Sequence, residues 1–239
     1  MISTLHKKTR KFLAGLLLLT SETIVSLVLF VAAVVVFVFI AKSVFWDQKA
    51  EFDAAVFLFF ERFVNERNTG LVSVMTGLGN YQFLVPANLV LIFYYLVIRR
   101  HRWYSIKIPA VAFGSLAIMF LLKWWFSRPR PLSPLLGPAL GYSFPSGHAT
   151  SSVTFFGLLI YFLWKKKTLA PAVRYVLILL LVLLILLIGI SRVYLRVHYA
   201  SDVVAGYCVG VIWLVFSIHL LDRIERRGRK KLEPMVENR

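Results

Sequence analysis

The chain has 239 residues, of which 59% are hydrophobic and only 16% are charged. Soluble globular domains carry about 25% charged residues, so the composition argues against a soluble protein and favours a chain that folds in lipid. In a soluble protein, the net charge of +17 would favour nucleic-acid binding. Here the basic residues cluster beside apolar runs, which indicates membrane topology and attraction to membrane lipids, with no nucleic-acid partner.

Six segments qualify as membrane spans, each of which needs about 20 mostly apolar residues in a helix. They are residues 16–41, 72–98, 108–125, 149–164, 175–190 and 203–221. The second is the weakest, because Gly77, Gly79 and Asn80 interrupt its first half. The first could instead be a cleaved signal peptide, but its apolar stretch exceeds the roughly 7 to 15 residues of such a segment. The sequence therefore predicts an all-α, single-domain protein over residues 1–239, built as an integral membrane bundle of six transmembrane helices.

Three further features concern the regions around the spans. Residues 52–63, which include Asp53, are rich in aromatic side chains and predict a short interfacial helix between spans one and two. A packed loop is the alternative. Gly206 and Gly210 stand four residues apart, a spacing that permits close helix contact. The polar segment 223–239 is expected to fray.

Four basic clusters fall on one side of the predicted bundle, at residues 7–11, 99–107, 165–167 and 223–231. Lys and Arg are enriched in cytoplasmic loops. We therefore expect a multi-pass protein of the cell membrane with both termini in the cytoplasm. The loops after spans one, three and five would then lie on the extracytoplasmic face.

Three groups of polar residues stand at the span ends that this topology places together on the extracytoplasmic face. They occupy residues 123–131, 145–148 and 191–202. Catalysis of phosphoryl transfer depends mainly on positioning and on stabilising charge on the phosphate oxygens. Basic side chains can provide that stabilisation without a metal. The coincidence therefore indicates a phosphate-processing site with no metal and no cofactor.

The phosphate-binding candidates are two kinds of group. Lys123, Arg130 and Arg192 offer positive charge, although each alone could simply extend to the membrane interface. Ser146 and Gly147 open a helix, where unpaired backbone N–H groups attract anions. A serine at that position is also an ordinary helix cap.

The catalytic candidates are His198, Asp202 and His148. Asp202 follows His198 by four residues, so on a helical turn the carboxylate can reach the imidazole and support the positive charge it gains as nucleophile or base. His148 lies on another segment and can protonate the leaving oxygen, which leaves His198 as the attacking group. Either histidine alone could be structural. Grouped with an aspartate and three basic residues near lipid, they indicate function.

These residues resemble the three motifs of the type 2 phosphatidic acid phosphatase superfamily. The motifs are carried by Lys123 with Arg130 and Pro131, by Pro145 to His148, and by Ser191 and Arg192 with His198 and Asp202, over residues 123–202. Within that superfamily the chain resembles bacterial phosphatidylglycerophosphatase B and the related undecaprenyl pyrophosphate phosphatases. The resemblance implies a six-helix bundle, metal-independent hydrolysis, His198 as nucleophile, Asp202 as its partner and His148 as general acid. It also implies phosphate contacts from Lys123, Arg130, Ser146, Gly147 and Arg192.

The expected reaction is hydrolysis of a lipid phosphate through a phosphohistidine intermediate. Phosphatidylglycerol phosphate is the first choice of substrate, with undecaprenyl pyrophosphate, phosphatidic acid and diacylglycerol pyrophosphate as alternatives. Other readings are a lipid head-group transferase, a vanadate-dependent haloperoxidase, which the spans argue against, and a channel or carrier, for which buried polar residues along the spans are lacking. Nothing in the sequence indicates an oligomeric state.

Overall fold

The computed structural model describes residues 21–137, 139–166 and 168–237, and within these ranges all regular structure is helical. The elements are α2 (Ser21–Phe45), α3 (Glu51–Glu61), α4 (Glu66–Gly77), α5 (Tyr81–Phe93), the π-helical turn η1 (Tyr94–Ile98), α6 (Arg102–Phe126), α7 (Gly147–Lys165), α8 (Pro171–Tyr194) and α9 (Ala200–Glu237). The predicted all-α class is confirmed. Residues 16–20 of the predicted first span lie outside the described residues.

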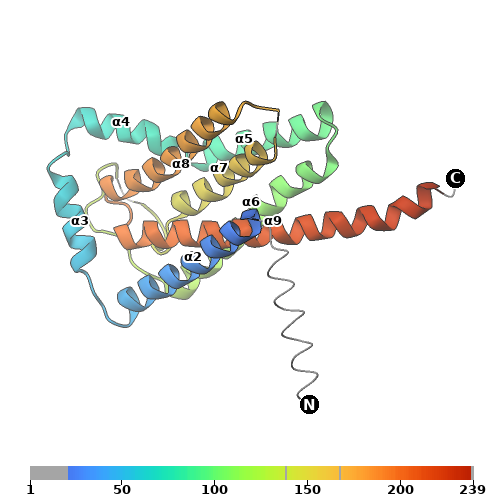
Figure 1. Cartoon of the computed structure of the whole chain (residues 1–239). Coiled ribbons are helices and arrows are strands. Elements are labelled where there is room, and N and C mark those ends of the chain that lie inside the picture. Colours follow the sequence, from blue (N-terminus) through green and yellow to red (C-terminus); the bar gives the residue numbers. More distant parts are fainter. Residues whose placement is uncertain (1–20, 138, 167, 238–239) are drawn as a thin grey trace, which may run out of the picture.

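The long helices run roughly along one direction, and α3 crosses their ends (Figure 1). Helix α7 occupies the centre of the bundle, where it packs against α6, α8 and α9. Phe155, Phe156 and Leu158 of α7 are buried, whereas most apolar side chains of α2 are exposed. An exposed apolar surface of this kind fits a lipid surrounding. Helix α7, which begins within the second polar motif, is therefore enclosed by other helices of the bundle.

Five helical stretches are long and apolar enough to cross a membrane, counted over the described part of the chain. They correspond to predicted spans one, two, three, five and six. The predicted fourth span forms α7, which has 19 residues and a length of about 28 Å. Its first turns are rich in Ser and Thr, which makes it less apolar than the other five. The count of six spans stays a prediction.

The predicted second span is interrupted at the glycines that weakened it. Helix α4 ends at Gly77, and α5 begins at Tyr81. A Cβ atom at Gly79 would lie 2.5 Å from Cγ2 of Ile188 and 3.1 Å from Cδ2 of His148. Glycine thus permits the break to pack closely against α7 and α8 beside a predicted catalytic residue.

The expected fraying from Arg223 is wrong, because α9 continues as a helix to Glu237. Lys107 of α6 is almost fully buried, and its Nζ lies 2.5 Å from Asp222 and 2.8 Å from Glu225 of α9. Removing one partner of a buried ion pair is costly. These contacts hold α9 beyond the end of its apolar stretch, and its last part projects from the bundle (Figure 1).

The small residues of α9 allow the close contact that their spacing predicted. A Cβ at Gly206 would lie 2.6 Å from the carbonyl oxygen of Ser146, and one at Gly210 would lie 2.6 Å from Cβ of Val153. Real Cβ atoms do not approach other atoms so closely, so α7 and α9 can meet at this distance only through glycine. This contact fixes the start of α7 against the start of α9.

The helix predicted at residues 52–63 is present as α3, so the alternative of a packed loop is wrong, and its place at the membrane interface stays a prediction. Its apolar residues Val56, Phe57 and Phe60 pack against Val193, Ala200 and Val203. Asp53, by contrast, is only 4% exposed. Helix α3 therefore covers the bundle end at which α8 stops and α9 starts.

Candidate active site

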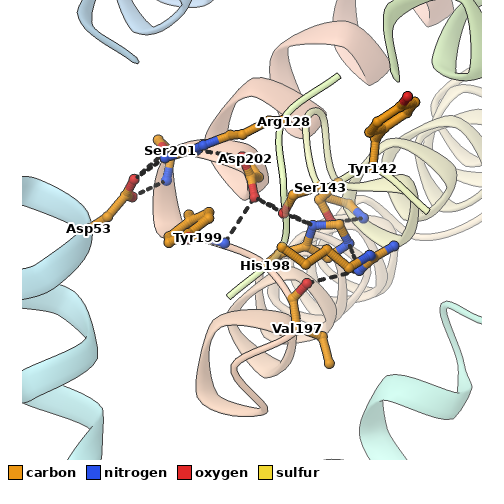
Figure 2. A network of polar contacts seen from close by, with 12 residues as sticks. Asp53, Arg128, Tyr142, Ser143, Val197, His198, Tyr199, Ser201 and Asp202 are labelled. Atoms are coloured by element: carbon orange, nitrogen blue, oxygen red, sulfur yellow. Dashed lines mark hydrogen bonds and ion pairs between the residues drawn. The ribbon is translucent and has the colours of Figure 1, made fainter. Parts of the chain in front are cut away.

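The structure brings the three predicted polar groups together at one end of the bundle. The first lies at the end of α6 and in the segment that follows, the second at the start of α7, and the third where α8 connects to α9. Figure 2 shows polar contacts that join the segment after α6 to the connection between α8 and α9 and to the start of α9. Residues separated by as many as 74 positions, Arg128 and Asp202, are in direct contact.

His198 lies in the short connection between α8 and α9, and its side chain is 3% exposed. Its Nε2 atom lies 3.3 Å from Nη1 of Arg130, and its Nδ1 atom lies 3.3 Å from Oγ of Ser143. A guanidinium has no acceptor, so Nε2 must accept in this contact. The neutral ring therefore carries its proton on Nδ1 and presents the lone pair of Nε2 toward the basic groups.

The predicted pairing of His198 with Asp202 consists of an ion-pair contact and a hydrogen-bonded path through Ser143. Nδ1 of His198 lies 3.6 Å from Oδ2 of Asp202, which is within ion-pair range but beyond a hydrogen bond. Ser143 donates to the same carboxylate oxygen at 2.5 Å and can accept from Nδ1. His198 precedes the first residue of α9, so the two side chains do not share a regular helical turn. Ser143 bridges the distance that remains.

Asp202 is fully buried and accepts several hydrogen bonds in addition to that of Ser143. The backbone N–H of Tyr199 donates to Oδ2 at 2.9 Å, and Nη1 of Arg128 donates to Oδ1 at 2.6 Å. A buried carboxylate with donors on both oxygens stays ionised. Its charge can then stabilise a positive His198 ring.

Each of the three predicted basic residues has donors left over. Lys123 donates to the carbonyl oxygen of Tyr142 at 2.5 Å, and Arg130 donates to those of Val197 at 2.8 Å and Gly141 at 3.0 Å. Arg192 donates from Nη1 to Thr76 at 2.9 Å. Its buried Nε has no acceptor among the described residues. Since a buried guanidinium donor is costly to leave unpaired, an anion is the natural partner.

The start of α7 carries the remaining predicted residues. Ser146 is buried and caps α7, because its Oγ accepts from the N–H of Ala149 at 3.5 Å. A hydroxyl that accepts can still donate its proton, so a phosphate contact from Ser146 stays a prediction. Gly147 is packed so tightly that a Cβ would lie 2.8 Å from Sδ of Met119.

His148 lies within electrostatic range of Arg192, His198, Arg130 and Lys123. The structure therefore gathers all eight predicted site residues.

Burial controls the protonation of the groups in this site that lie outside the spanning helices. It lowers the pKa of His198 to about 4, although Asp202 opposes the shift. Burial also lowers the pKa of Arg130. For Arg128, burial acts in the same direction, but the carboxylates of Asp202 and Asp53 outweigh it and raise the pKa. At neutral pH the site thus combines a neutral His198 with positive Arg side chains.

The first prediction concerns the titration of His198. Because its pKa is lowered, the neutral and nucleophilic ring should persist as the pH falls from 7 and be lost only as the pH passes through about 4. NMR of histidine-labelled protein in detergent measures this directly, with His198→Ala used to assign the signal. A ring that titrates near the ordinary value of about 6.5 would contradict the buried arrangement.

Sequence reasoning missed Asp53, Ser143, Thr76 and Ser201 as contributors to the site, and it gave Arg128 no role. Arg128 stands within the first motif and Ser143 two residues before the second, so both were close to the recognised pattern. Asp53 and Thr76 lie on α3 and α4, far from every motif. A carboxylate in a helix otherwise rich in apolar residues was the one available signal for Asp53.

Comparisons with known proteins identify the family and agree with the fold. The family model of the PAP2 superfamily matches residues 104–226. Phosphatidylglycerophosphatase B of Bacillus subtilis (strain 168) is 30% identical over 181 residues, which cover 74% of this chain and 84% of that protein.

Two solved structures share the fold. A transmembrane PAP2 type phosphatidylglycerolphosphate phosphatase from Bacillus subtilis matches with a TM-score of 0.73 and 24% identity, over 82% of this chain and 96% of that one. LpxE of Aquifex aeolicus matches with a TM-score of 0.55 and 24% identity, over 70% of this chain and 94% of that one. The resemblance read from the motifs is confirmed: the chain belongs to the PAP2 superfamily and is related to its membrane lipid phosphatases.

Proposed function

We propose that the protein hydrolyses the phosphomonoester of phosphatidylglycerol phosphate to give phosphatidylglycerol and inorganic phosphate, through a phosphohistidine on His198. The observation that carries this proposal is the setting of His198 Nε2. It lies 3.3 Å from Arg130 and within electrostatic range of Lys123. A nucleophile surrounded by donors for phosphate oxygens is the arrangement that phosphoryl transfer requires.

The proposed reaction has two steps. In the first, Nε2 of His198 attacks phosphorus, the bond from phosphorus to the lipid oxygen breaks, and that oxygen takes a proton from the protonated form of His148. Lys123, Arg130 and Arg192 stabilise the charge on the three transferred oxygens, and Asp202 stabilises the positive ring. In the second, water attacks phosphorus, the bond from phosphorus to nitrogen breaks, and His148 takes the proton from water. Inorganic phosphate leaves, and both histidines return to their starting states.

A lipid substrate is supported by the surface beside Lys123. An apolar cavity of about 290 Å³ opens there between α2 and α6, lined by Phe37, Leu121, Leu122, Trp124, Trp125 and Phe126. Trp124 and Trp125 are mostly exposed, and such side chains favour the level of the lipid head groups. Acyl chains next to this surface would leave the phosphate at the basic groups. Undecaprenyl pyrophosphate and related lipid phosphates are proposed as further substrates.

We propose a cell-membrane location with both termini in the cytoplasm and the site on the extracytoplasmic face. The basic segments around Arg99 to Lys107, Lys165 and Arg223 lie at the opposite end of the bundle from the site (Figure 1). Positively charged loops favour the cytoplasmic side, which supports this orientation. The site would then act on lipid phosphates that reach the outer leaflet.

The second prediction tests substrate and metal dependence together. Purified protein in detergent with a chelator should release phosphate from phosphatidylglycerol phosphate, and more slowly from undecaprenyl pyrophosphate and phosphatidic acid. The physical reason is that the basic side chains supply the charge that a metal would otherwise supply. Loss of release in chelator, restored by a divalent ion, would contradict the metal-independent proposal. Transfer of the phosphate-bearing group to a lipid acceptor, with no free phosphate, would indicate the transferase.

A further inference from the structure

Arg128 joins two buried carboxylates that belong to different helices. Its Nη1 donates to Asp202 at 2.6 Å and to Oγ of Ser201 at 2.8 Å, and its Nη2 donates to Asp53 at 2.9 Å. The guanidinium also lies over the ring of Tyr199, 4.0 Å from its centroid. The Arg128 side chain is 13% exposed. The charge of Arg128 is thus paired with two carboxylates of the protein. Among the described residues, Lys123, Arg130 and Arg192 have no such carboxylate partner and contact mainly carbonyl and hydroxyl oxygens.

Asp53 fixes the start of α9 from outside that helix. Its Oδ1 accepts from the backbone N–H of Ser201 at 2.8 Å, and its Oδ2 accepts from Oγ of Ser201 at 2.7 Å. The first N–H groups of a helix have no partner within the helix, so a carboxylate placed there is stabilising. Figure 2 shows Asp53 reaching toward Ser201 from one side while Ser143 and His198 lie on the other side of Asp202.

We propose that Asp53 and Arg128 are positioning residues for the catalytic pair, which makes the interfacial helix α3 part of the active site. Arg128 holds Oδ1 of Asp202, so Oδ2 alone faces Ser143, the N–H of Tyr199 and His198. Asp53 holds both Arg128 and the first turn of α9, and so sets the orientation of Asp202. The arrangement keeps the His198 proton on Nδ1 and the lone pair on Nε2. The inference rests on the proposed function of this site.

The test compares two carboxylates of the same helix, each paired with an arginine. Asp53→Asn keeps the shape of the side chain but removes one acceptor for Arg128. Glu61→Gln makes the same chemical change in the pair of Glu61 with Arg196, at 3.2 Å, where the Glu61 side chain is 60% exposed. Because small displacements of a catalytic group cost up to about 10²-fold in rate, Asp53→Asn should lower kcat by about tenfold. KM should stay within about twofold, and Glu61→Gln should match the wild type.

A substitution at Arg128 gives a second line of evidence. Arg128→Lys keeps the positive charge, but a single ammonium does not reproduce the planar fork that spans two carboxylates. A loss of kcat of about tenfold with unchanged KM is expected, together with an unfolding temperature close to that of the wild type. A rise in KM with unchanged kcat would instead mean that Arg128 binds the substrate phosphate and would overturn the proposal. Equal effects of Asp53→Asn and Glu61→Gln would also overturn it.

The tautomer of His198 provides a readout that needs no turnover. In ¹⁵N-histidine-labelled wild type, NMR should place the proton on Nδ1, and in Arg128→Lys the two tautomers should mix. A wild type that releases no phosphate from any lipid while showing this pattern would refute the proposed function and support the positioning role. An unchanged tautomer and unchanged kcat in Arg128→Lys would refute the positioning role, even if Asp53→Asn did not fold.

Discussion

Replacing His198 by alanine is expected to lower phosphate release from lipid substrates by at least about 10⁴-fold. The imidazole presents its Nε2 atom beside Arg130 and forms the bond to phosphorus in the proposed reaction, so neither step can proceed without it. The measurement is the initial rate of phosphate release by purified protein in detergent. The unfolding temperature of each variant shows that the comparison is made between folded proteins.

A matched control is His219→Ala, since His219 is an exposed residue of α9 far along the helix from Asp202. This variant should retain the wild-type rate within about twofold, as expected for a surface position. If His198→Ala kept a substantial part of the wild-type rate, the covalent route through His198 would be wrong. If His219→Ala lost as much activity as His198→Ala, the loss would reflect the fold of α9 and not the chemistry.

Replacing His148 by alanine is expected to lower the rate with lipid substrates by about 10³-fold, in the range of general acid and base catalysis. A lipid alkoxide leaves slowly without a proton, whereas 4-nitrophenolate leaves readily without one. With 4-nitrophenyl phosphate, His148→Ala should therefore release one nitrophenolate per protein at close to the wild-type rate. Turnover should then become slow, because His148 is also needed to take the proton from water.

The leaving-group comparison separates acid catalysis from a structural role of His148. The ring lies beside the break between α4 and α5, where Gly79 approaches it closely. Loss of that packing would slow both substrates equally and would remove the rapid first release. Such a result would show that His148 supports the site without acting as its acid.

The motif residues could be predicted from the sequence because each belongs to a short local pattern. A serine and a glycine before a helix, a histidine four residues before an aspartate, and basic residues at span ends are all visible along the chain. Their meeting at one end of the bundle followed from the order of the spans. The structure places these motif residues together at that end of the bundle, and the role of each residue stays a prediction.

The supporting contacts could not be predicted, because they join residues distant in sequence. Ser201 contacts Asp53 across 148 positions, and Arg192 contacts Thr76 across 116. Such contacts depend on how closely the helices pack, which glycines such as Gly206 decide at single positions. The extent of α9 was mispredicted for the same reason, since the ion pairs of Lys107 that hold its polar part come from another helix.

Rapid quenching tests most directly whether the phosphate passes through a covalent bond to His198. Protein mixed with phosphatidylglycerol phosphate labelled in its terminal phosphate is quenched in alkali within one turnover and digested. A phosphohistidine on His198 should appear as a label that is stable in alkali and lost in acid. The label should lie on the peptide that contains His198 and be absent from His198→Ala. Full turnover with no protein-bound label at any quench time, or a label on another residue, would contradict it.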